Sequence, residues 1–154
     1  MQGTQNLKND VQAICEQLGI DVHWYSVETC AVNWAHWKER KINVREIYNC
    51  GDYAAAFHEI GHVECDAGEK QQGVLLVLQE CRAWQWAIDR RKDAFDSGAW
   101  QRIGNALDCY LRDCGIDEQK APEQWKEIMQ LVGSHSIYGV PSPGSLGRKK
   151  KKLG

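Results

Sequence analysis

The segment Phe57-His58-Glu59-Ile60-Gly61-His62 places two imidazoles four residues apart, with a carboxylate beside the first. On an α-helix, four residues turn the chain by roughly 400°, so His58 and His62 project from nearly the same face and can bind one ion. Glu59 is rotated by about 100° from His58, which suits it less to the same ligand pair. It can instead reach a water at the open position of a bound metal. The spacing therefore predicts a zinc site in which Glu59 acts as the general base.

Two histidines at this spacing also occur by chance on ordinary helices, so the interpretation depends on a third ligand. The pattern of apolar residues predicts a second helix over residues 72 to 95, and its apolar side chains cover an arc of roughly 220° when residues are plotted at 100° intervals. Glu80 lies near the centre of this arc. A carboxylate with apolar neighbours is costly to bury unless it is paired or binds a metal.

Glu80 has three explanations: a salt bridge to Arg45 or Arg91, a proton that leaves it neutral, or a bond to the metal. Glu64 and Asp66, which closely follow the second histidine, are alternative third ligands. Metal binding by Glu80 accounts for both the histidine pair and the inward-facing carboxylate. We therefore predict that His58, His62 and Glu80 bind one Zn²⁺ ion, with a water completing a four-coordinate site.

The rest of the chain predicts a compact α+β fold. A helix is expected over residues 6 to 18 and ends at Gly19. Three short strands follow at residues 22 to 27, 31 to 37 and 42 to 47, and a turn at 38 to 41 favours an antiparallel sheet. The helix of the histidine motif is expected from residue 53 to about 66, stopped by Gly68, and Gly61 lets another helix approach it closely. Further helices are expected over residues 98 to 114 and from Pro122 through Val132.

The chain resembles the gluzincin metallopeptidases, and among them the small ImmA/IrrE-type peptidases of phages, mobile elements and bacteria. The residues that carry the resemblance are His58-Glu59-Ile60-Gly61-His62 and Glu80-Cys81-Arg82-Ala83-Trp84-Gln85-Trp86-Ala87. It covers residues 6 to 95 and implies a zincin-like domain with its small sheet beside the active-site helix. It also implies a zinc-dependent endopeptidase that hydrolyses a protein or peptide substrate. The chain departs from the group at Ile88-Asp89-Arg90-Arg91, and no helix-turn-helix module is evident.

Length and composition favour one domain over residues 1 to 140, followed by a basic, disordered tail over residues 141 to 154. The 154 residues are 43% hydrophobic and 26% charged, as in soluble globular proteins. No segment approaches the roughly 20 apolar residues that cross a bilayer, and the polar start lacks a signal peptide's apolar region, so we expect a cytoplasmic protein. The seven cysteines are an odd number without regular spacing, which is typical of reduced, mostly structural thiols.

The charge distribution argues against a nucleic-acid-binding domain. The net charge is −2, and five basic residues lie in the run Arg148-Lys149-Lys150-Lys151-Lys152. Without that run, 14 basic and 21 acidic residues remain, a net charge of −7. A domain that binds nucleic acid should carry a basic face, so any such contact is expected only through the tail.

The sequence leaves open which residue stabilises the transition state and whether the protein is an enzyme. His135 or Tyr138, outside any clear element, are candidates to stabilise the transition state, although an ordinary loop is the simpler expectation. The alternative to an enzyme is a zincin-fold regulatory protein that acts by occupying a partner, for example a phage product against a host factor. The sequence does not indicate the oligomeric state of the protein.

Overall fold

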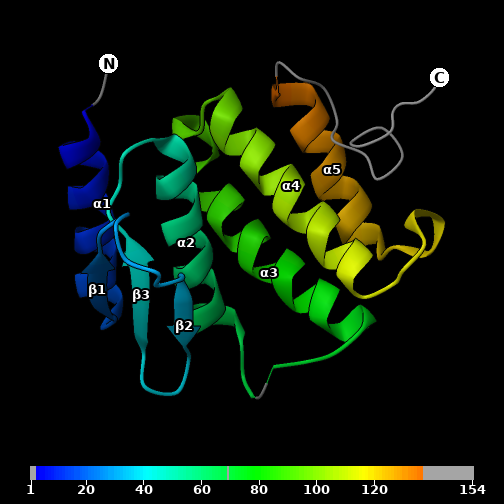
Figure 1. Ribbon diagram of the computed structural model, residues 1–154, viewed down its shortest axis with the longest axis horizontal. Helices are drawn as coiled ribbons and strands as arrows, with labels where there is room; N and C mark the ends of the chain where they lie inside the picture. Colours follow the sequence, from blue (N-terminus) through cyan, green and yellow to red (C-terminus); the bar gives the residue numbers. More distant parts are fainter. Residues whose placement is uncertain (1–2, 69, 137–154) are drawn as a thin grey trace. The chain divides into compact units, whose positions relative to one another are not determined.

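The computed structural model describes residues 3–68 and 70–136, and its elements confirm the α+β fold class (Figure 1). The elements are, in chain order, α1 (Thr4–Leu18), β1 (Asp21–Tyr25), β2 (Trp34–His36), β3 (Lys41–Arg45), α2 (Cys50–Cys65), α3 (Val74–Arg91), the 3-10 helix η1 (Lys92–Ala94), α4 (Ser97–Asp113), the 3-10 helix η2 (Glu118–Lys120) and α5 (Glu123–His135).

The chain forms two compact units. The first contains Met1–Glu69 and Arg82–Phe95, and the second contains Lys70–Cys81 and Asp96–Gly154. The boundary between them passes through α3, after Cys81. The expectation of one domain over residues 1 to 140 stays a prediction, and the expected tail over residues 141 to 154 lies outside the described residues.

The sheet of the first unit has the strand order β1-β3-β2. β2 and β3 form the expected antiparallel hairpin, with Ala35 opposite Ile42. β1 pairs with the other side of β3 in a parallel direction, with Trp24 beside Val44, so the prediction of a wholly antiparallel sheet is wrong and the sheet is mixed. Parallel strands need a long connection, and here residues 26–40, which include β2, provide it.

The loop between β1 and β2 is held to the ends of β1 and β3 by one side chain. The amide oxygen of Asn33 accepts hydrogen bonds from the hydroxyl of Tyr25, at 2.8 Å, and from the backbone N–H of Arg45, at 3.0 Å. Tyr25 ends β1 and Arg45 ends β3. Asn33 therefore fixes the crossing that makes β1 and β3 parallel.

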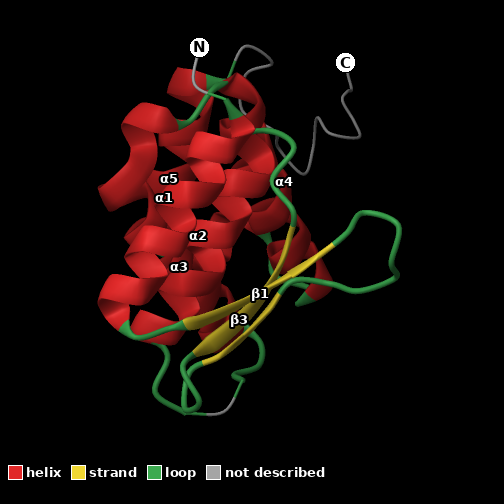
Figure 2. Ribbon diagram, turned by 90° about the vertical axis from the view of Figure 1, so that its left-hand side faces the viewer, coloured by secondary structure: helices red, strands yellow, loops and turns green. Residues whose placement is uncertain are grey.

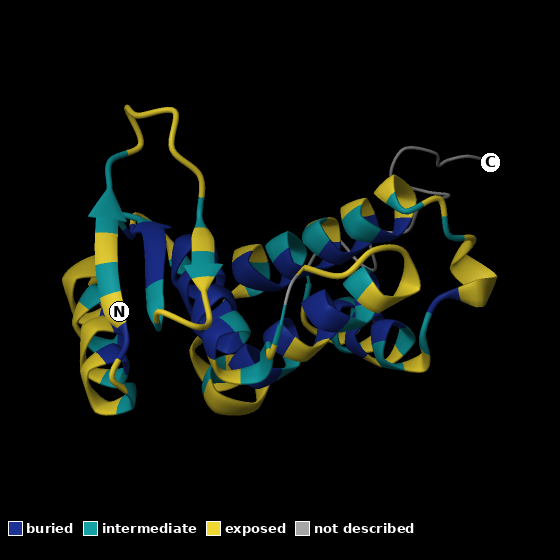
Figure 3. Cartoon of the chain, turned by 90° about the horizontal axis from the view of Figure 1, so that it is seen from below, coloured by how far each residue is buried: buried dark blue, intermediate teal, exposed yellow. Residues whose placement is uncertain are grey.

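α2 is the most enclosed helix of the first unit. Every residue from Gly51 to Gly61 is buried, and the helix contacts α1, β2 and β3 (Figure 3). A helix that buries apolar side chains all round must be covered on several sides, in contrast to an amphipathic surface helix. The histidine motif is therefore carried by the central helix of this unit. Figure 2 shows the strands passing beside the helices.

The second unit contains α4 and α5, whose buried residues include Leu107, Leu111, Trp125 and Ile128. The indole N–H of Trp125 donates a hydrogen bond to the carbonyl of Leu107 at 3.0 Å, which ties α5 to α4. Among the residues that the structure describes, no helix is both long enough and apolar enough to cross a bilayer.

Candidate metal site

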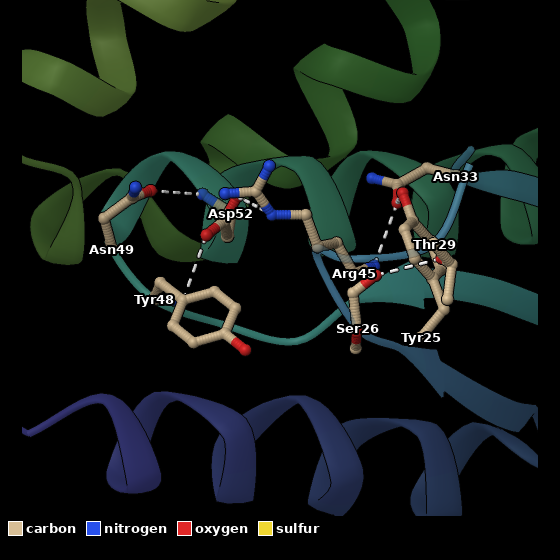
Figure 4. A network of polar contacts seen from close by, with 8 residues as sticks. All are labelled: Tyr25, Ser26, Thr29, Asn33, Arg45, Tyr48, Asn49 and Asp52. Carbon is tan, nitrogen blue, oxygen red and sulfur yellow. Dashed lines mark hydrogen bonds and ion pairs between the residues drawn. The ribbon is translucent and has the colours of Figure 1, made fainter. Parts of the chain in front are cut away.

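The start of α2 is fixed by a network of polar contacts (Figure 4). Asn49 caps the helix, because its side-chain oxygen accepts a hydrogen bond from the backbone N–H of Asp52 at 2.8 Å. The Asp52 carboxylate in turn accepts a hydrogen bond from the backbone N–H of Tyr48 at 3.0 Å and lies 3.5 Å from Nε of Arg45. Arg45 belongs to β3, so the network sets the position of α2 against the central strand.

One turn along α2, a second set of polar contacts joins three helices. The hydroxyl of Tyr53 donates a hydrogen bond to Asp10 of α1 at 2.5 Å, and Nε of Arg91 of α3 donates to the same carboxylate at 2.7 Å. Burial raises the pKa of the Asp10 carboxyl, but the hydrogen bonds from Arg91 and Tyr53 outweigh burial and leave the pKa below its usual value. Burial and the Asp10 carboxylate raise the pKa of Tyr53. The charged form of Asp10 therefore helps to hold these helices together.

The candidate metal site follows on the same helix. One donor atom from each of His58, Glu59 and His62 lies within 4.8 Å of the others. The two imidazole rings have their centroids 4.5 Å apart, nearly edge to face at 69°. The side chains of His58 and Glu59 are 8% and 11% exposed, and that of His62 is 12% exposed. The helical spacing thus brings the three predicted groups together in a largely buried cluster.

Each imidazole has a carboxylate beside its Nδ1 atom. Oε2 of Glu59 lies 3.3 Å from Nδ1 of His58, and Oδ2 of Asp66 lies 2.9 Å from Nδ1 of His62. The second distance is that of a hydrogen bond. The prediction that Gly68 stops the helix is wrong, because α2 ends at Cys65 and Asp66 is its cap residue, with its backbone N–H bonded to the carbonyl of His62.

The end of α3 that belongs to the first unit packs closely against this cluster. The indole of Trp84 stacks on His58, with ring centroids 4.1 Å apart and planes 13° from parallel. A Cβ atom on Gly61 would lie 2.4 Å from the carbonyl oxygen of Ala83. The expectation that Gly61 permits close helix approach is confirmed, whereas no sequence signal identified Trp84 as a neighbour of His58.

The composition of the cluster fits a divalent metal. Imidazole nitrogens are common zinc ligands, so His58 and His62 can supply two of them, and a carboxylate beside them can bind the metal or act on its water. Two buried polar atoms next to the imidazoles, Nε1 of Trp84 and Oδ1 of Asp66, have no hydrogen-bond partner among the described residues. Buried polar atoms of this kind call for an explanation, and an ion or a water bound beside the imidazoles would provide one for Oδ1 of Asp66.

The third predicted ligand, Glu80, is a buried residue of α3 and belongs to the second unit. The two arginines weighed as its salt-bridge partners both have another carboxylate, since Arg45 pairs with Asp52 and Arg91 pairs with Asp10. Coordination by Glu80 stays a prediction.

The two alternative third ligands have partners of their own. Glu64 forms an ion pair with Arg40, a residue of the turn between β2 and β3. Asp66 is hydrogen-bonded to His62, which is one of the predicted ligands. A carboxylate four residues after the second histidine is the sequence signal from which this contact could have been expected.

The expectation of a loop around His135 is wrong, because this residue is the last of α5. Its Nδ1 atom lies 2.9 Å from the carbonyl oxygen of Leu131, and its ring stacks on Trp100 with centroids 4.5 Å apart. Tyr138 lies outside the described residues. A role for His135 or Tyr138 in stabilising the transition state stays a prediction.

Comparisons with protein-family models, with curated proteins and with solved structures find no match to this chain. The resemblance to gluzincin peptidases therefore rests on the two motifs alone.

Proposed function

We propose that the protein is a zinc-dependent metallopeptidase that hydrolyses peptide bonds of a protein substrate. The observation that carries this proposal is the convergence of His58, Glu59 and His62 within 4.8 Å on the buried helix α2. Burying three polar groups at the centre of a unit is costly, and a metal-binding role accounts for the cost.

The chemistry divides between the metal and Glu59. A zinc ion, when bound, lowers the pKa of a bound water and polarises a carbonyl group. Glu59 accepts the proton of the attacking water and then donates it to the amine that leaves when the peptide bond breaks. His58 and His62 hold the metal through their imidazole nitrogens, and the 4.1 Å stack of Trp84 on His58 restricts the rotation of that ring.

Glu80 is proposed as the third zinc ligand. The support for this assignment is that Glu80 is a carboxylate buried among the apolar residues of α3, which is costly unless the group is paired or binds a metal.

A protein substrate has a place to bind along β2. This strand pairs only with β3 among the described residues, so its second edge offers backbone groups to an added strand. β2 also contacts α2, which carries the histidines. Trp34, the first residue of β2, and Trp37, which follows its last residue, are 40% and 38% exposed and supply apolar surface for substrate side chains.

Two substitutions test this function. Glu59→Gln keeps the shape of the side chain but removes its basicity, so it should retain stoichiometric zinc and lower the rate of cleavage by about 10² to 10⁴-fold. Glu80→Gln should lose stoichiometric zinc in metal analysis of the purified protein. Glu64→Gln is the comparison variant: it should affect neither measurement, because Glu64 pairs with Arg40, and loss of zinc in this variant would instead identify Glu64 as the ligand.

The outcomes separate the parts of the proposal. Unchanged cleavage by Glu59→Gln rejects Glu59 as the general base. Full zinc retention by Glu80→Gln rejects Glu80 as a ligand and returns attention to Glu64 and Asp66. The substrate for these assays is a library of unstructured peptides, with products identified by mass spectrometry.

The second candidate function is a regulatory protein that occupies a partner. The apolar side chains exposed between β1 and the end of β2 favour it, because they offer a surface for protein binding: Val27, Val32, Trp34 and Trp37. If this function is correct, Glu59→Gln should leave the cellular activity intact and Trp34→Ser should abolish it. The peptidase proposal expects Glu59→Gln to abolish the activity.

We also propose that the protein acts in the cytoplasm. None of the seven cysteines, all of which lie in the described part of the chain, forms a disulfide, and Cys15 and Cys81 are buried. Reduced cysteines are the rule in a reducing compartment.

A further inference from the structure

Within the part of the chain that the structure describes, Asp66 makes two hydrogen bonds, and both are with His62. Its backbone N–H donates a hydrogen bond to the carbonyl of His62 at 2.9 Å, which ends α2. Its Oδ2 atom lies 2.9 Å from Nδ1 of the same residue. The backbone of Asp66 is extended, with φ −77° and ψ 143°, so the arrangement requires no strain. The end of the helix therefore places a carboxylate against one fixed edge of the His62 ring.

This contact determines which nitrogen of His62 is able to bind a metal. An ionised carboxylate only accepts hydrogen bonds, so Nδ1 must carry the proton in the bond to Asp66. The other nitrogen, Nε2, then keeps its lone pair. A histidine that binds a metal through one nitrogen commonly donates the proton on its other nitrogen to a carboxylate or carbonyl, which fixes the tautomer and the orientation of the ring.

We propose that Asp66 is a positioning residue of the metal site, which holds His62 with Nδ1 protonated and Nε2 available to a divalent cation. This inference rests on the proposed function, because it assumes that His62 binds the metal. It differs from the alternative in which Asp66 is itself a ligand. Asp66 acts through His62, and its loss should weaken metal binding without changing the set of ligand atoms.

The contrast with the neighbouring carboxylate strengthens the assignment. Glu64 lies two residues before Asp66 but is directed to Arg40. The carboxylate of Asp66 is 13% exposed, and its second oxygen, Oδ1, is buried without a hydrogen-bond partner among the described residues. Among the described residues, the side chain of Asp66 is therefore hydrogen-bonded to one group, an imidazole that is also part of the candidate metal-binding cluster.

The test is a metal titration of the full chain after removal of metal by a chelator. Zn²⁺ affinity is measured by competition with a chromophoric chelator, and the coordination geometry is read from the visible absorption of the Co²⁺ form. The variants are Asp66→Ala, Asp66→Asn and the control Glu64→Gln. Circular dichroism and thermal unfolding of the metal-free proteins establish that each variant is folded.

Asp66→Ala should bind Zn²⁺ about 10 to 100-fold more weakly than the wild type, as expected for loss of such a partner. Asp66→Asn retains an oxygen that accepts the Nδ1 proton, so it should recover most of the affinity, and Glu64→Gln should match the wild type. The Co²⁺ spectrum of Asp66→Ala at saturation should match that of the wild type, because the ligand atoms are unchanged.

The inference is overturned if Asp66→Ala binds Zn²⁺ as tightly as the wild type. It is also overturned if Asp66→Asn is as weak as Asp66→Ala and both have an altered Co²⁺ spectrum, since that result makes Asp66 a ligand. Zinc binding by the wild type without peptide cleavage rejects the peptidase function and leaves the role of Asp66 intact. A wild-type protein that binds no metal rejects both.

Discussion

Two clusters of polar side chains on α2 differ in the partners of their carboxylates. In the first, the carboxylate of Asp10 accepts hydrogen bonds from the hydroxyl of Tyr53 and from the guanidinium of Arg91. In the second, the carboxylates of Glu59 and Asp66 lie beside the imidazoles of His58 and His62. Arg91 carries a permanent charge, whereas an imidazole is charged only when it is protonated.

This difference separates a structural cluster from a chemical one. The first cluster links α1, α2 and α3 by bonds that are complete within the protein, and Arg91 also lies over the ring of Phe57 at 4.7 Å. The second gathers donor atoms of the kinds that bind divalent metals. We therefore expect substitutions in the first to change stability and not metal affinity, and substitutions of the ligands in the second to do the reverse.

The largest effect is expected from Gly61→Ala, which disturbs the packing on which the second cluster depends. The added methyl group would lie 2.4 Å from the carbonyl oxygen of Ala83, a backbone atom that cannot move aside without shifting α3. Overpacking of this kind should lower the free energy of unfolding by about 3 kcal/mol. Urea denaturation of the metal-free protein measures the loss.

Gly98→Ala is the matched control for this substitution. Gly98 lies in the first turn of α4, where the nearest atom to an added Cβ is a side-chain oxygen of Asp96 at 3.4 Å. Alanine is the better helix former, so the control should gain up to about 0.5 kcal/mol. An equal loss of stability in both variants would contradict the close approach at Gly61.

A smaller effect is expected from Arg91→Met, which breaks the first cluster. It removes the charged hydrogen bonds to Asp10 and the contact with Phe57, and should lower the free energy of unfolding by about 1 to 2 kcal/mol. Zinc affinity of the folded variant should stay unchanged.

Lys8→Met serves as the comparison for Arg91→Met, because Lys8 forms a partly exposed ion pair with Glu46 at 2.7 Å. Such a pair contributes no more than about 1 kcal/mol. If Arg91→Met weakens zinc binding as strongly as it lowers stability, the two clusters are coupled and the division between them fails.

The smallest effect concerns pH and the first cluster alone. The pKa of Asp10 is lower in the folded protein than its usual value, so the charged carboxylate stabilises the fold at all pH values above its unfolded pKa of about 4. This stabilisation is lost as the pH falls from there through the folded pKa. The difference in unfolding free energy between the wild type and Asp10→Asn should be constant from pH 7 to about pH 5 and should shrink below about pH 4.

Denaturation of the metal-free proteins at each pH checks this dependence without interference from metal binding. Because the Asp10 side chain is 34% exposed, water screens its charge, and the change is expected to be modest. A difference that grows as the pH falls would have the wrong sign for a carboxyl with a lowered pKa.

The helices and the donor cluster could be predicted because their signals are local. His58, Glu59 and His62 lie within five residues of one helix, so helical geometry alone determines that they meet. The turn at residues 37–40 is likewise a short-range feature. This explains why the antiparallel pairing of β2 with β3 was predicted correctly.

The features that could not be predicted depend on long-range packing or on a single helix end. The parallel pairing of β1 with β3 is decided by the path of residues 26–33, held by Asn33, and strand patterns carry no information about that path. The four-residue spacing indicates that Asp66 can meet His62, but not that Asp66 is also the cap residue of α2, because helix ends are difficult to locate within one or two residues. The contact of Trp84 with His58 requires the packing of two helices that the motif alone does not define.

The stacking of Trp84 on His58 also gives the protein an optical probe of its own site. The indole is 2% exposed and its centroid lies 4.1 Å from that of the imidazole. Its emission should therefore lie at short wavelength, and an ion with an unfilled d shell bound by His58 would be close enough to quench it. Occupancy of the cluster can then be followed as a partial loss of intrinsic fluorescence, since six other tryptophans also emit, without a substrate and before any substrate is known.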